Sequence, residues 1–590
     1  MFSNKENVNI LTALLLKHHV RHAVVCPGSR NAPIVHNLSE CGGVACCPVT
    51  DERSAGFVAL GMSLATQSPV VVCVTSGTAL LNLMPAVAEA FYQHAPIVVV
   101  SADRPASWID QQDGQTLPQS GALSPFVKKS VSLPEPHDEE EHWYCNRLVN
   151  EALLELRFHE RGPVHINVPI SEPLYDFSVA NLPQERRICR RFSFGDSGVT
   201  DVMARHFLGA RHPMIVMGQL YDDFVVAEDF GETMAFLSSY GVVLAERLCQ
   251  LGNNCVPVDE ALTVVGHDKR YQPDVVLYLG GTLVSKHLKQ FLRQVKDAEV
   301  FRISRSGAVC DTFMNVTEVV QCDSVQALAD IHAMYQAERD ADSGELLFSE
   351  HPERAEYRRL WQCVFDRVTK QSRAFEPSFS QMAAVKAFEE GLQTRAIDCQ
   401  VHYANSTAVR LANIYSRHFV WCNRGVNGIE GSLSTAVGMS LVVEKRVFCV
   451  IGDLSFFYDQ NALWALRSAS ARQLKGREAR PDNFRILLLN NGGGGIFGKF
   501  EGLRRSPARN ELVMGCHRTT AAGICDQNSV CYRSARDMES LQTGINWLLD
   551  SSETRSMLLE VFTDREEDVK AMEAYFASFS NLDTSKTKRL

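Results

Sequence analysis

The chain has 590 residues, of which 45% are hydrophobic and 22% charged, a balance typical of a soluble globular protein rather than a disordered one. Its formal net charge of −10, with no long basic block apart from a short basic tail, argues against nucleic acid as a partner. A chain of this length exceeds what one hydrophobic core supports, so we expect three domains.

The first predicted helix covers the apolar run ILTALLL at residues 10–16. This run is too short to cross a bilayer, is followed by His18 and His19, and has no small-residue cleavage site behind it. We therefore interpret it as an amphipathic helix and expect no transmembrane segment.

Beyond this helix, apolar runs with β propensity alternate with longer stretches of helical pattern. Five such runs lie within residues 22–170, five within 213–323 and five within 401–562, the last being VHYANS, FVWCN, RVFCVIGD, RILLLNN and MLLEVF. The alternation predicts an α/β fold of parallel sheets covered by helices on both faces. We expect doubly wound domains at 1–185, 195–345 and 370–580, with 337–354 as a linker leading into a helix.

The 18 cysteines are scattered along the chain, and several lie inside apolar runs, as Cys73 and Cys449 do. This distribution favours buried free thiols and a cytoplasmic protein over a disulfide scaffold. Cys525 and Cys531, with His517 nearby, form at most a weak metal-binding pattern, and loop cysteines are the preferred interpretation.

Two apolar runs of the third series end in polar residues with oxygen-bearing side chains. Asp453 follows VFCVIG and precedes a stretch of helical pattern, whereas Asn491 follows the next strand along the chain. In a right-handed β-α-β unit the two strands lie parallel and often adjacent, which brings both side chains to one sheet edge. Carboxylate and amide oxygens suit Mg²⁺, and the glycines after Asn491 allow a diphosphate to approach the backbone.

Each of these endings has other interpretations. Gly-Asp and Asn-Gly are common turn formers, and either one alone is more often a turn than a ligand. Gly493, Gly495 and Gly498 also form a G-x-G-x-x-G pattern after a strand, which suggests a dinucleotide-binding dehydrogenase. That fingerprint requires an acidic residue at the end of the next strand, whereas Glu511 opens its apolar run.

The order of GD and NN is similar to the metal and diphosphate signature of thiamine-diphosphate enzymes, which are built from three α/β domains. The resemblance implies a pyrimidine-binding domain at 1–185, a central domain at 195–345 and a diphosphate-binding domain at 370–580. More narrowly, the chain resembles the 2-succinyl-5-enolpyruvyl-6-hydroxy-3-cyclohexene-1-carboxylate (SEPHCHC) synthases of menaquinone biosynthesis. Six motifs carry this resemblance, in the same order over essentially the whole chain: PGSRNAP, TDER, TSGTA, ADRP, NRGVNGIEG and GDLSF.

This resemblance implies a transferase that uses thiamine diphosphate with Mg²⁺ or Mn²⁺. The implied reaction is decarboxylation of 2-oxoglutarate, followed by 1,4-addition of the succinyl-semialdehyde carbanion to isochorismate. It also implies a homodimer or homotetramer whose sites are shared between subunits. The alternatives are another thiamine-diphosphate-dependent 2-keto acid decarboxylase or carboligase, and a catalytically silent scaffold or nucleotide-binding regulator that kept the fold.

The resemblance assigns Glu52 to the pyrimidine ring of the cofactor, where an acid/base partner is worth about 10²–10⁴ in rate. It assigns Ile429 to the apolar support that bends the cofactor, and Phe497 to packing near the thiazolium. The implied cofactor-binding set is Glu52, Ile429, Gly452, Asp453, Leu454, Ser455, Asn491, Gly493, Ile496 and Phe497. The implied metal ligands are Asp453, Asn491 and Gly493. By sequence alone, Glu52 would be a solvated turn residue and Ile429 a core residue.

Both implied substrates are dianions, which arginine holds well because its planar fork grips a carboxylate with two hydrogen bonds. Arg30, Arg410 and Arg424 match the substrate-site arginines of this family, and Ser29, Gln115 and Ser406 match its polar contacts. Lys286 matches the first residue of a basic pair whose second position here is His287 rather than arginine. The separation of Asp453 from Asn491 also exceeds that of the family, and we interpret the excess at 474–483 as a surface loop.

Overall fold

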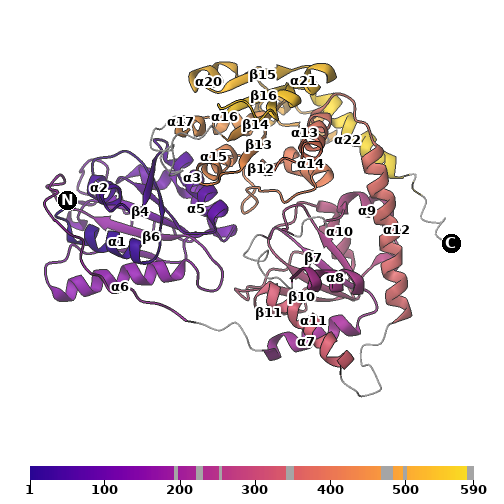
Figure 1. Cartoon of the computed structure of the whole chain (residues 1–590), viewed down its shortest axis with the longest axis horizontal. Coiled ribbons are helices and arrows are strands. Elements are labelled where there is room, and N and C mark those ends of the chain that lie inside the picture. Colours follow the sequence, from indigo (N-terminus) through magenta and orange to yellow (C-terminus); the bar gives the residue numbers. More distant parts are fainter. Residues whose placement is uncertain are drawn as a thin grey trace.

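The computed structural model describes residues 1–191, 197–220, 230–250, 255–340, 351–466, 483–495, 501–580 and 582. The predictions on Ile496, Phe497, Gly498 and almost all of the loop at 474–483 lie outside these residues. Three α/β domains follow one another along the chain, each around one parallel sheet (Figure 1). This confirms the predicted fold class.

The N-terminal domain, indigo to purple in Figure 1, contains a six-stranded parallel sheet of order β2-β1-β3-β4-β6-β5. Every residue of β3 and β4 is buried, which is expected where helices cover both faces of a parallel sheet. The strands are β1 His22–Val25, β2 Ala45–Pro48, β3 Val70–Val74, β4 Ile97–Asp103, β5 Ser130–Ser132 and β6 Val164–Pro169. The α-helices are α1 Glu6–Lys17, α2 Ala32–Glu40, α3 Glu52–Thr66, α4 Thr78–Asn82, α5 Met84–Tyr92 and α6 Glu139–Glu155.

The central domain, magenta in Figure 1, has a five-stranded sheet of order β11-β10-β9-β7-β8, and its five strands match the five predicted runs. The strands are β7 Pro213–Met217, β8 Val242–Ala245, β9 Val275–Leu279, β10 Glu299–Ser304 and β11 Glu318–Gln321. The α-helices are α7 Ser197–Gly209, α8 Phe230–Tyr240, α9 Val258–Val265, α10 Lys286–Gln294 and α11 Ser324–Asp340.

The C-terminal domain, orange to yellow in Figure 1, has a sheet of order β12-β13-β14-β16-β15. The strands are β12 Cys399–Tyr403, β13 Arg446–Gly452, β14 Phe484–Asn490, β15 Cys531–Ala535 and β16 Met557–Phe562. The α-helices are α13 Gln381–Thr394, α14 Thr407–Tyr415, α15 Ser432–Val442, α16 Asp453–Tyr458, α17 Ala462–Ala465, α19 Glu501–Arg504, α20 Ala522–Gln527, α21 Met538–Leu548 and α22 Arg565–Ser580.

Four local predictions were wrong. The run FVWCN is no strand, because it makes only an isolated bridge between His402 and Trp421. Helix α1 is not amphipathic, since all its residues from Asn7 to Leu15 are buried. The supposed linker at 337–354 begins inside α11, which continues to Asp340. Cys525 and Cys531 lie in α20 and β15 rather than in loops.

The thiol prediction was correct. All 18 cysteines are free, and only Cys189 and Cys310 are exposed. Among the helices that the structure describes, none combines the length and apolar character needed to cross a bilayer.

The N- and C-terminal domains join through α3 and α15, which pack closely along glycine positions. A Cβ on Gly61 would lie 1.9 Å from the carbonyl oxygen of Thr435, and one on Gly438 would lie 2.1 Å from that of Val58. Only residues without side chains allow two helix backbones to approach in this way. The buried apolar side chains of the two domains therefore form one continuous cluster.

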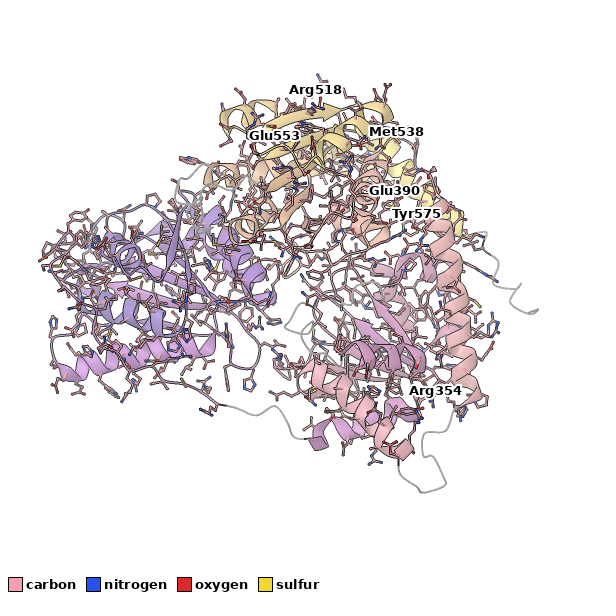
Figure 2. The ribbon with its side chains drawn as sticks, in the orientation of Figure 1. Arg354, Glu390, Arg518, Met538, Glu553 and Tyr575 are labelled. Carbon is pink, nitrogen blue, oxygen red and sulfur yellow. The ribbon has the colours of Figure 1, made fainter. Side chains whose placement is uncertain are left out.

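Helix α12, Pro352–Ala374, runs along one side of the molecule and connects the central to the C-terminal domain. Arg354 lies at its end beside the central domain and donates to the carbonyl oxygens of Leu208 and Ala210, at 3.1 and 3.0 Å. Tyr575 lies where the other end of α12 meets α22 (Figure 2), and its hydroxyl contacts Glu260 and Ser372. The central and C-terminal domains also share an apolar cluster.

Candidate active site

Strands β13 and β14 are parallel neighbours, with Gly452 opposite Leu489, so their carboxyl ends meet at one sheet edge. Asp453 begins α16 there and is buried. Its Oδ2 accepts hydrogen bonds from the backbone N–H of Gly492 at 2.8 Å and of Gly493 at 3.0 Å, and its Oδ1 accepts from Leu454 at 2.7 Å. The structure thus brings together the two chain segments that the sequence placed at one edge.

The glycines after Asn491 have conformations that suit them to this contact. Gly492 has φ +75° and Gly493 φ +154°, both outside the range that side chains favour. A Cβ on Gly493 would also lie 3.0 Å from the carbonyl oxygen of Met514. A side chain at either position would therefore strain the turn that brings these N–H groups to Asp453.

Asn491 is oriented by Asp568. Its amide nitrogen donates to Asp568 Oδ2 at 2.9 Å, and within the described residues its amide oxygen takes no hydrogen bond. That oxygen is therefore available to a cation. Burial raises the pKa of Asp568, and hydrogen bonds from Gln381, Asn491 and Thr563 lower it.

His517 is a neighbour of Asp453 that the sequence did not connect with it. Its Nε2 lies 3.3 Å from Asp453 Oδ2, and its ring packs edge-on against Phe457. Burial raises the pKa of Asp453, whereas the Leu454 N–H and His517 act in the opposite direction. In the described part of the chain no three His, Cys, Asp or Glu side chains are placed to hold a metal ion, so the weak pattern of Cys525, Cys531 and His517 forms no such cluster there.

A cavity of about 320 Å³ extends from this edge to the central domain. Lys286, His287 and Arg410 line it, together with Asn491 and Gly495. Lys286 opens α10, whose N-cap Ser285 accepts from the N–H of Leu288 at 2.9 Å. One cavity therefore joins Lys286 and Arg410, two of the predicted substrate cations, to Asn491, one of the three predicted metal ligands.

Glu246 supports this end of α10 from the end of β8. It is buried, and its two carboxylate oxygens accept from the N–H of Val284 at 2.7 Å and of Ser285 at 2.6 Å. Burial raises its pKa to about 7, although both N–H donors favour the ionised form. Sequence analysis did not single out Glu246, because an acid after a short strand has no distinguishing pattern.

Arg424 bonds to Asn405, the residue that precedes Ser406 in the chain. Arg424 is buried, and its Nη1 donates to Asn405 Oδ1 at 3.0 Å. Burial lowers the pKa of Arg410, and the charge of Arg424 lowers it further. Lys289 is a cation that the sequence analysis missed; burial and then Arg424 lower its pKa. It lies three residues after Lys286, a helical spacing that could have revealed it.

Ile429 and Ser455 are tied to the Asp453 helix. The Ser455 hydroxyl donates to the Ile429 carbonyl oxygen, while the Ile429 side chain remains 42% exposed. Leu454, between Asp453 and Ser455, is half-buried. An exposed branched side chain next to this site is available to support a bound molecule.

The other predicted residues lie in the N-terminal domain: Ser29 and Arg30 follow β1, Glu52 follows β2, and Gln115 lies in the loop after β4. The order β2-β1-β3-β4 makes the carboxyl ends of these strands neighbours. Glu52 is the first residue of α3, capped by Asp51, and makes no side-chain hydrogen bond or ion pair to the rest of the described chain. Ser29 is exposed after β1. A free, half-buried carboxylate at a sheet edge can serve a ligand.

Arg30 is already bonded within the N-terminal domain, whereas Gln115 is exposed. Arg30 is buried and donates to the carbonyl oxygen of Ile170 at 2.9 Å and to Glu172 at 3.1 Å, so in this structure its fork is occupied. Gln115 is exposed, in a loop held by Arg104, which pairs with Asp113 at 2.8 Å and donates to the Gly114 carbonyl at 3.2 Å. Glu52, Ser29, Arg30 and Gln115 do not line the 320 Å³ cavity of their own chain.

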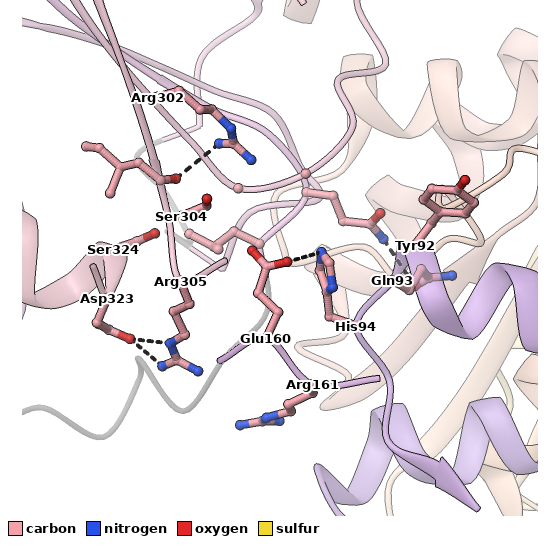
Figure 3. Close-up of a pocket in the computed structure, with 15 residues that line it drawn as sticks. Tyr92, Gln93, His94, Glu160, Arg161, Arg302, Ser304, Arg305, Asp323 and Ser324 are labelled. Carbon is pink, nitrogen blue, oxygen red and sulfur yellow. Dashed lines mark hydrogen bonds and ion pairs between the residues drawn. The ribbon is translucent and has the colours of Figure 1, made fainter. Parts of the chain in front are cut away.

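A second cavity of about 110 Å³ lies between the N-terminal and central domains, and no predicted site residue lines it. Its charged side chains are largely paired with one another (Figure 3). His94 lies 3.4 Å from Glu160, and Arg305 pairs with Asp323. This cavity is separate from the candidate site.

Residues 6–122 match a family model described as "Thiamine pyrophosphate enzyme, N-terminal TPP binding domain". Curated relatives named SEPHCHC synthase match nearly the whole chain. The relative from Bacteroides thetaiotaomicron is 41% identical over 98% of this chain and 99% of its own length. Those from Phocaeicola vulgatus and Porphyromonas gingivalis are 39% and 36% identical, each over 98% of this chain and 100% and 98% of their own.

The chain belongs to the SEPHCHC synthase family. It is accordingly a thiamine-diphosphate-dependent enzyme, and the alternative of a dinucleotide-binding dehydrogenase is rejected. The structure agrees with that outcome, because Glu511 lies in the helical turn Arg509–Val513 and not at the end of a strand. The glycine-rich turn after β14 instead faces the carboxylate of Asp453.

Proposed function

We propose that this chain decarboxylates 2-oxoglutarate and joins the remaining four-carbon unit to isochorismate, with thiamine diphosphate and Mg²⁺ or Mn²⁺ bound at the Asp453 edge. The observation that carries the proposal is the single cavity that joins Lys286 and Arg410 to Asn491 and Gly495. It provides anion-binding groups next to oxygen ligands for a hard cation.

The residues at the Asp453 edge fit a cation with a diphosphate. Asp453 supplies a carboxylate, Asn491 an amide oxygen left free by its bond to Asp568, and Gly493 a backbone group at the same turn. The cofactor supplies an electron sink for the bond that breaks. Glu52 would hold a proton against its pyrimidine ring, and Ile429 would support its bent form.

The cationic end orients the substrates. Arg410, Arg424 and Lys286 present fixed positive charge to the carboxylates of both dianions. Burial of Arg424 and Arg410 strengthens this effect, since less water screens them. These residues would thereby hold the substrate carboxylates in a fixed position next to the cofactor site.

We propose further that the site is shared between subunits of a homodimer or homotetramer. Glu52, Ser29, Arg30 and Gln115 form one edge of the N-terminal sheet, yet none of them lines the cavity of the same chain. A second copy would complete the site by presenting its N-terminal edge to this cavity.

The activity test incubates the purified protein with thiamine diphosphate, Mg²⁺, 2-oxoglutarate and isochorismate. The expected result is a product whose mass equals the sum of both substrates less carbon dioxide, absent when either substrate or the cofactor is omitted. Release of carbon dioxide without this product would indicate a different acceptor. No reaction of 2-oxoglutarate at all would refute the proposal.

The shared site has its own test. Glu52→Gln and Asp453→Ala are each expected to be inactive, and the two proteins are mixed under conditions of subunit exchange. In a mixed dimer one site carries both changes and the other neither, so random exchange restores about a quarter of parental activity. A site built within one chain would recover none.

A further inference from the structure

The loop at 423–430 carries both Arg424 and Ile429, so its placement sets the geometry of two predicted contacts. From inside the C-terminal domain, the Asn405 amide nitrogen donates to the carbonyl oxygens of Asn423 at 2.6 Å and Gly428 at 2.9 Å. Ser455 donates to the Ile429 carbonyl. These contacts hold the two ends of the loop, and within the described part of the domain no hydrogen bond reaches the backbone N–H groups in its middle, at Gly425 and Val426.

The middle of the loop is held by Glu89, which belongs to α5 of the N-terminal domain. Glu89 is only 3% exposed, and its two carboxylate oxygens accept from the backbone N–H of Gly425 and of Val426, each at 2.7 Å. Gln93, one turn later, donates to the same carboxylate at 2.5 Å. Burial raises the pKa of Glu89, and the two backbone donors lower it.

A second observation shows how closely the loop approaches α5. A Cβ on Gly425 would lie 2.7 Å from the Glu89 carbonyl oxygen, 3.0 Å from Tyr92 Cβ and 3.2 Å from Gln93 Cγ. The first of these atoms is backbone, which cannot move without displacing the helix. Gly425 is therefore required for the loop to reach the Glu89 carboxylate.

Among the described residues, three other carboxylates accept from two consecutive backbone N–H groups of a segment at least 38 positions away along the chain. Glu246 holds the residues before Lys286, and Asp453 holds the turn after Asn491. Asp274, just before β9, accepts from Arg211 at 2.9 Å and His212 at 2.8 Å, just before β7. Since Asp274 lies at the amino ends of these strands, it serves as a control with the same chemistry at the opposite edge.

We infer that Glu89 is a positioning residue for this enzyme: it reaches across from the N-terminal domain, holds the middle of this loop and thereby places Arg424 for the substrate. The inference rests on the proposed function for its kinetic consequence. Its physical basis is separate, because a buried charged acceptor holds two N–H groups that would otherwise have no partner. Substrate affinity would thereby depend on how the N- and C-terminal domains pack.

The first test measures the contact itself by hydrogen exchange of a peptide that covers residues 420–431. Glu89→Gln leaves one acceptor oxygen and turns an NH₂ group toward the second N–H, so exchange at Gly425 or Val426 should accelerate. Gly425→Ala should accelerate it too, by moving the loop away from α5. Asp274→Asn should leave this peptide unchanged.

The second test measures kinetics and cofactor binding below the melting temperature of each variant. Glu89→Gln should raise KM for 2-oxoglutarate by about tenfold, the effect of one displaced charged hydrogen bond, while cofactor affinity changes by less than about threefold. Gly425→Ala should likewise raise KM for 2-oxoglutarate while cofactor affinity changes little. Asp274→Asn should lower the melting temperature without a change in KM.

Unchanged exchange in Glu89→Gln would overturn the contact. If Glu89→Gln and Gly425→Ala both showed faster hydrogen exchange but parental KM and kcat, Glu89 would only connect the two domains. Its positioning role would then be overturned. If the parent formed no product, the proposed function would fail, and the exchange comparison would still decide whether Glu89 holds the loop.

Discussion

The two ends of the candidate site are built differently. At the cofactor end, Asp453 and the glycines of residues 492–493 follow adjacent strands of one sheet and meet inside one domain. At the substrate end, carboxylates from the N-terminal and central domains hold the backbone next to Arg424 and the backbone just before Lys286. The first end depends on a local β-α-β unit, whereas the second depends on how three domains pack.

The largest effect is expected from Glu52→Gln, which tests whether the N-terminal edge belongs to the chemistry at all. The amide cannot exchange a proton with the pyrimidine ring, so turnover should fall by about 10²–10⁴. Cofactor affinity, measured by titration calorimetry, should be retained. Near-parental turnover would remove Glu52 from the mechanism.

Asp453→Ala should disrupt the cofactor end alone. It removes a predicted cation ligand and leaves the backbone N–H groups of Leu454 and Gly493 without their acceptor, so affinity for Mg²⁺ and thiamine diphosphate should fall about a hundredfold. Calorimetric titration measures the loss, and Asp453→Asn controls for side-chain shape. Parental cofactor affinity in the alanine variant would contradict the assignment.

Arg424→Lys should disrupt the substrate end alone. Lysine keeps the charge but loses the planar fork, so KM for 2-oxoglutarate should rise about tenfold while cofactor affinity stays within about twofold. Steady-state kinetics together with cofactor titration separate the two. If cofactor affinity fell as much as KM for 2-oxoglutarate rose, the cofactor end and the substrate end would not be independent.

The smallest effect on turnover is expected from Glu246→Gln, which sharpens the comparison through pH. Because burial raises the pKa of Glu246 to about 7, the folded state binds a proton that the unfolded state releases near its ordinary value. Stability from this group is therefore full at low pH and declines as pH rises through 7.

The glutamine variant lacks that decline, so its stability relative to the parent should increase between pH 5 and pH 8, by on the order of 1–3 kcal/mol. Thermal unfolding at the two pH values measures it. A difference that does not vary with pH would show that the Glu246 carboxyl is ionised throughout this range.

The cofactor end could be predicted from sequence because the elements that form it are neighbours along the chain. Strand, helix and strand follow one another, and the polar residues sit where apolar runs stop, which predicted that Asp453 and Asn491 share an edge. The predicted roles of Arg30 and Gln115 rest on family resemblance and remain predictions. The domain boundaries at 185, 195, 345 and 370 also remain predictions.

The substrate end was not readable in the same way. Glu89 is a single acid in an ordinary helix, and its partner Gly425 lies 336 positions away. No periodicity or motif encodes such a pair, since it arises only when α3 and α15 bring two domains together. Strands β5 and β15 were missed for a related reason: SVS and CYRSA lack an apolar run, because each strand lies at the edge of its sheet.

The close passage of α3 against α15 has a consequence for dissecting this protein. Both flanking domains bury apolar side chains in clusters that also contain residues of the C-terminal domain. A truncated C-terminal fragment would expose two apolar surfaces to water, one toward each missing domain. Large exposed apolar surfaces promote self-association. Work on individual pieces of this enzyme would therefore report on aggregates, and the intact polypeptide is the smallest useful unit for biochemistry.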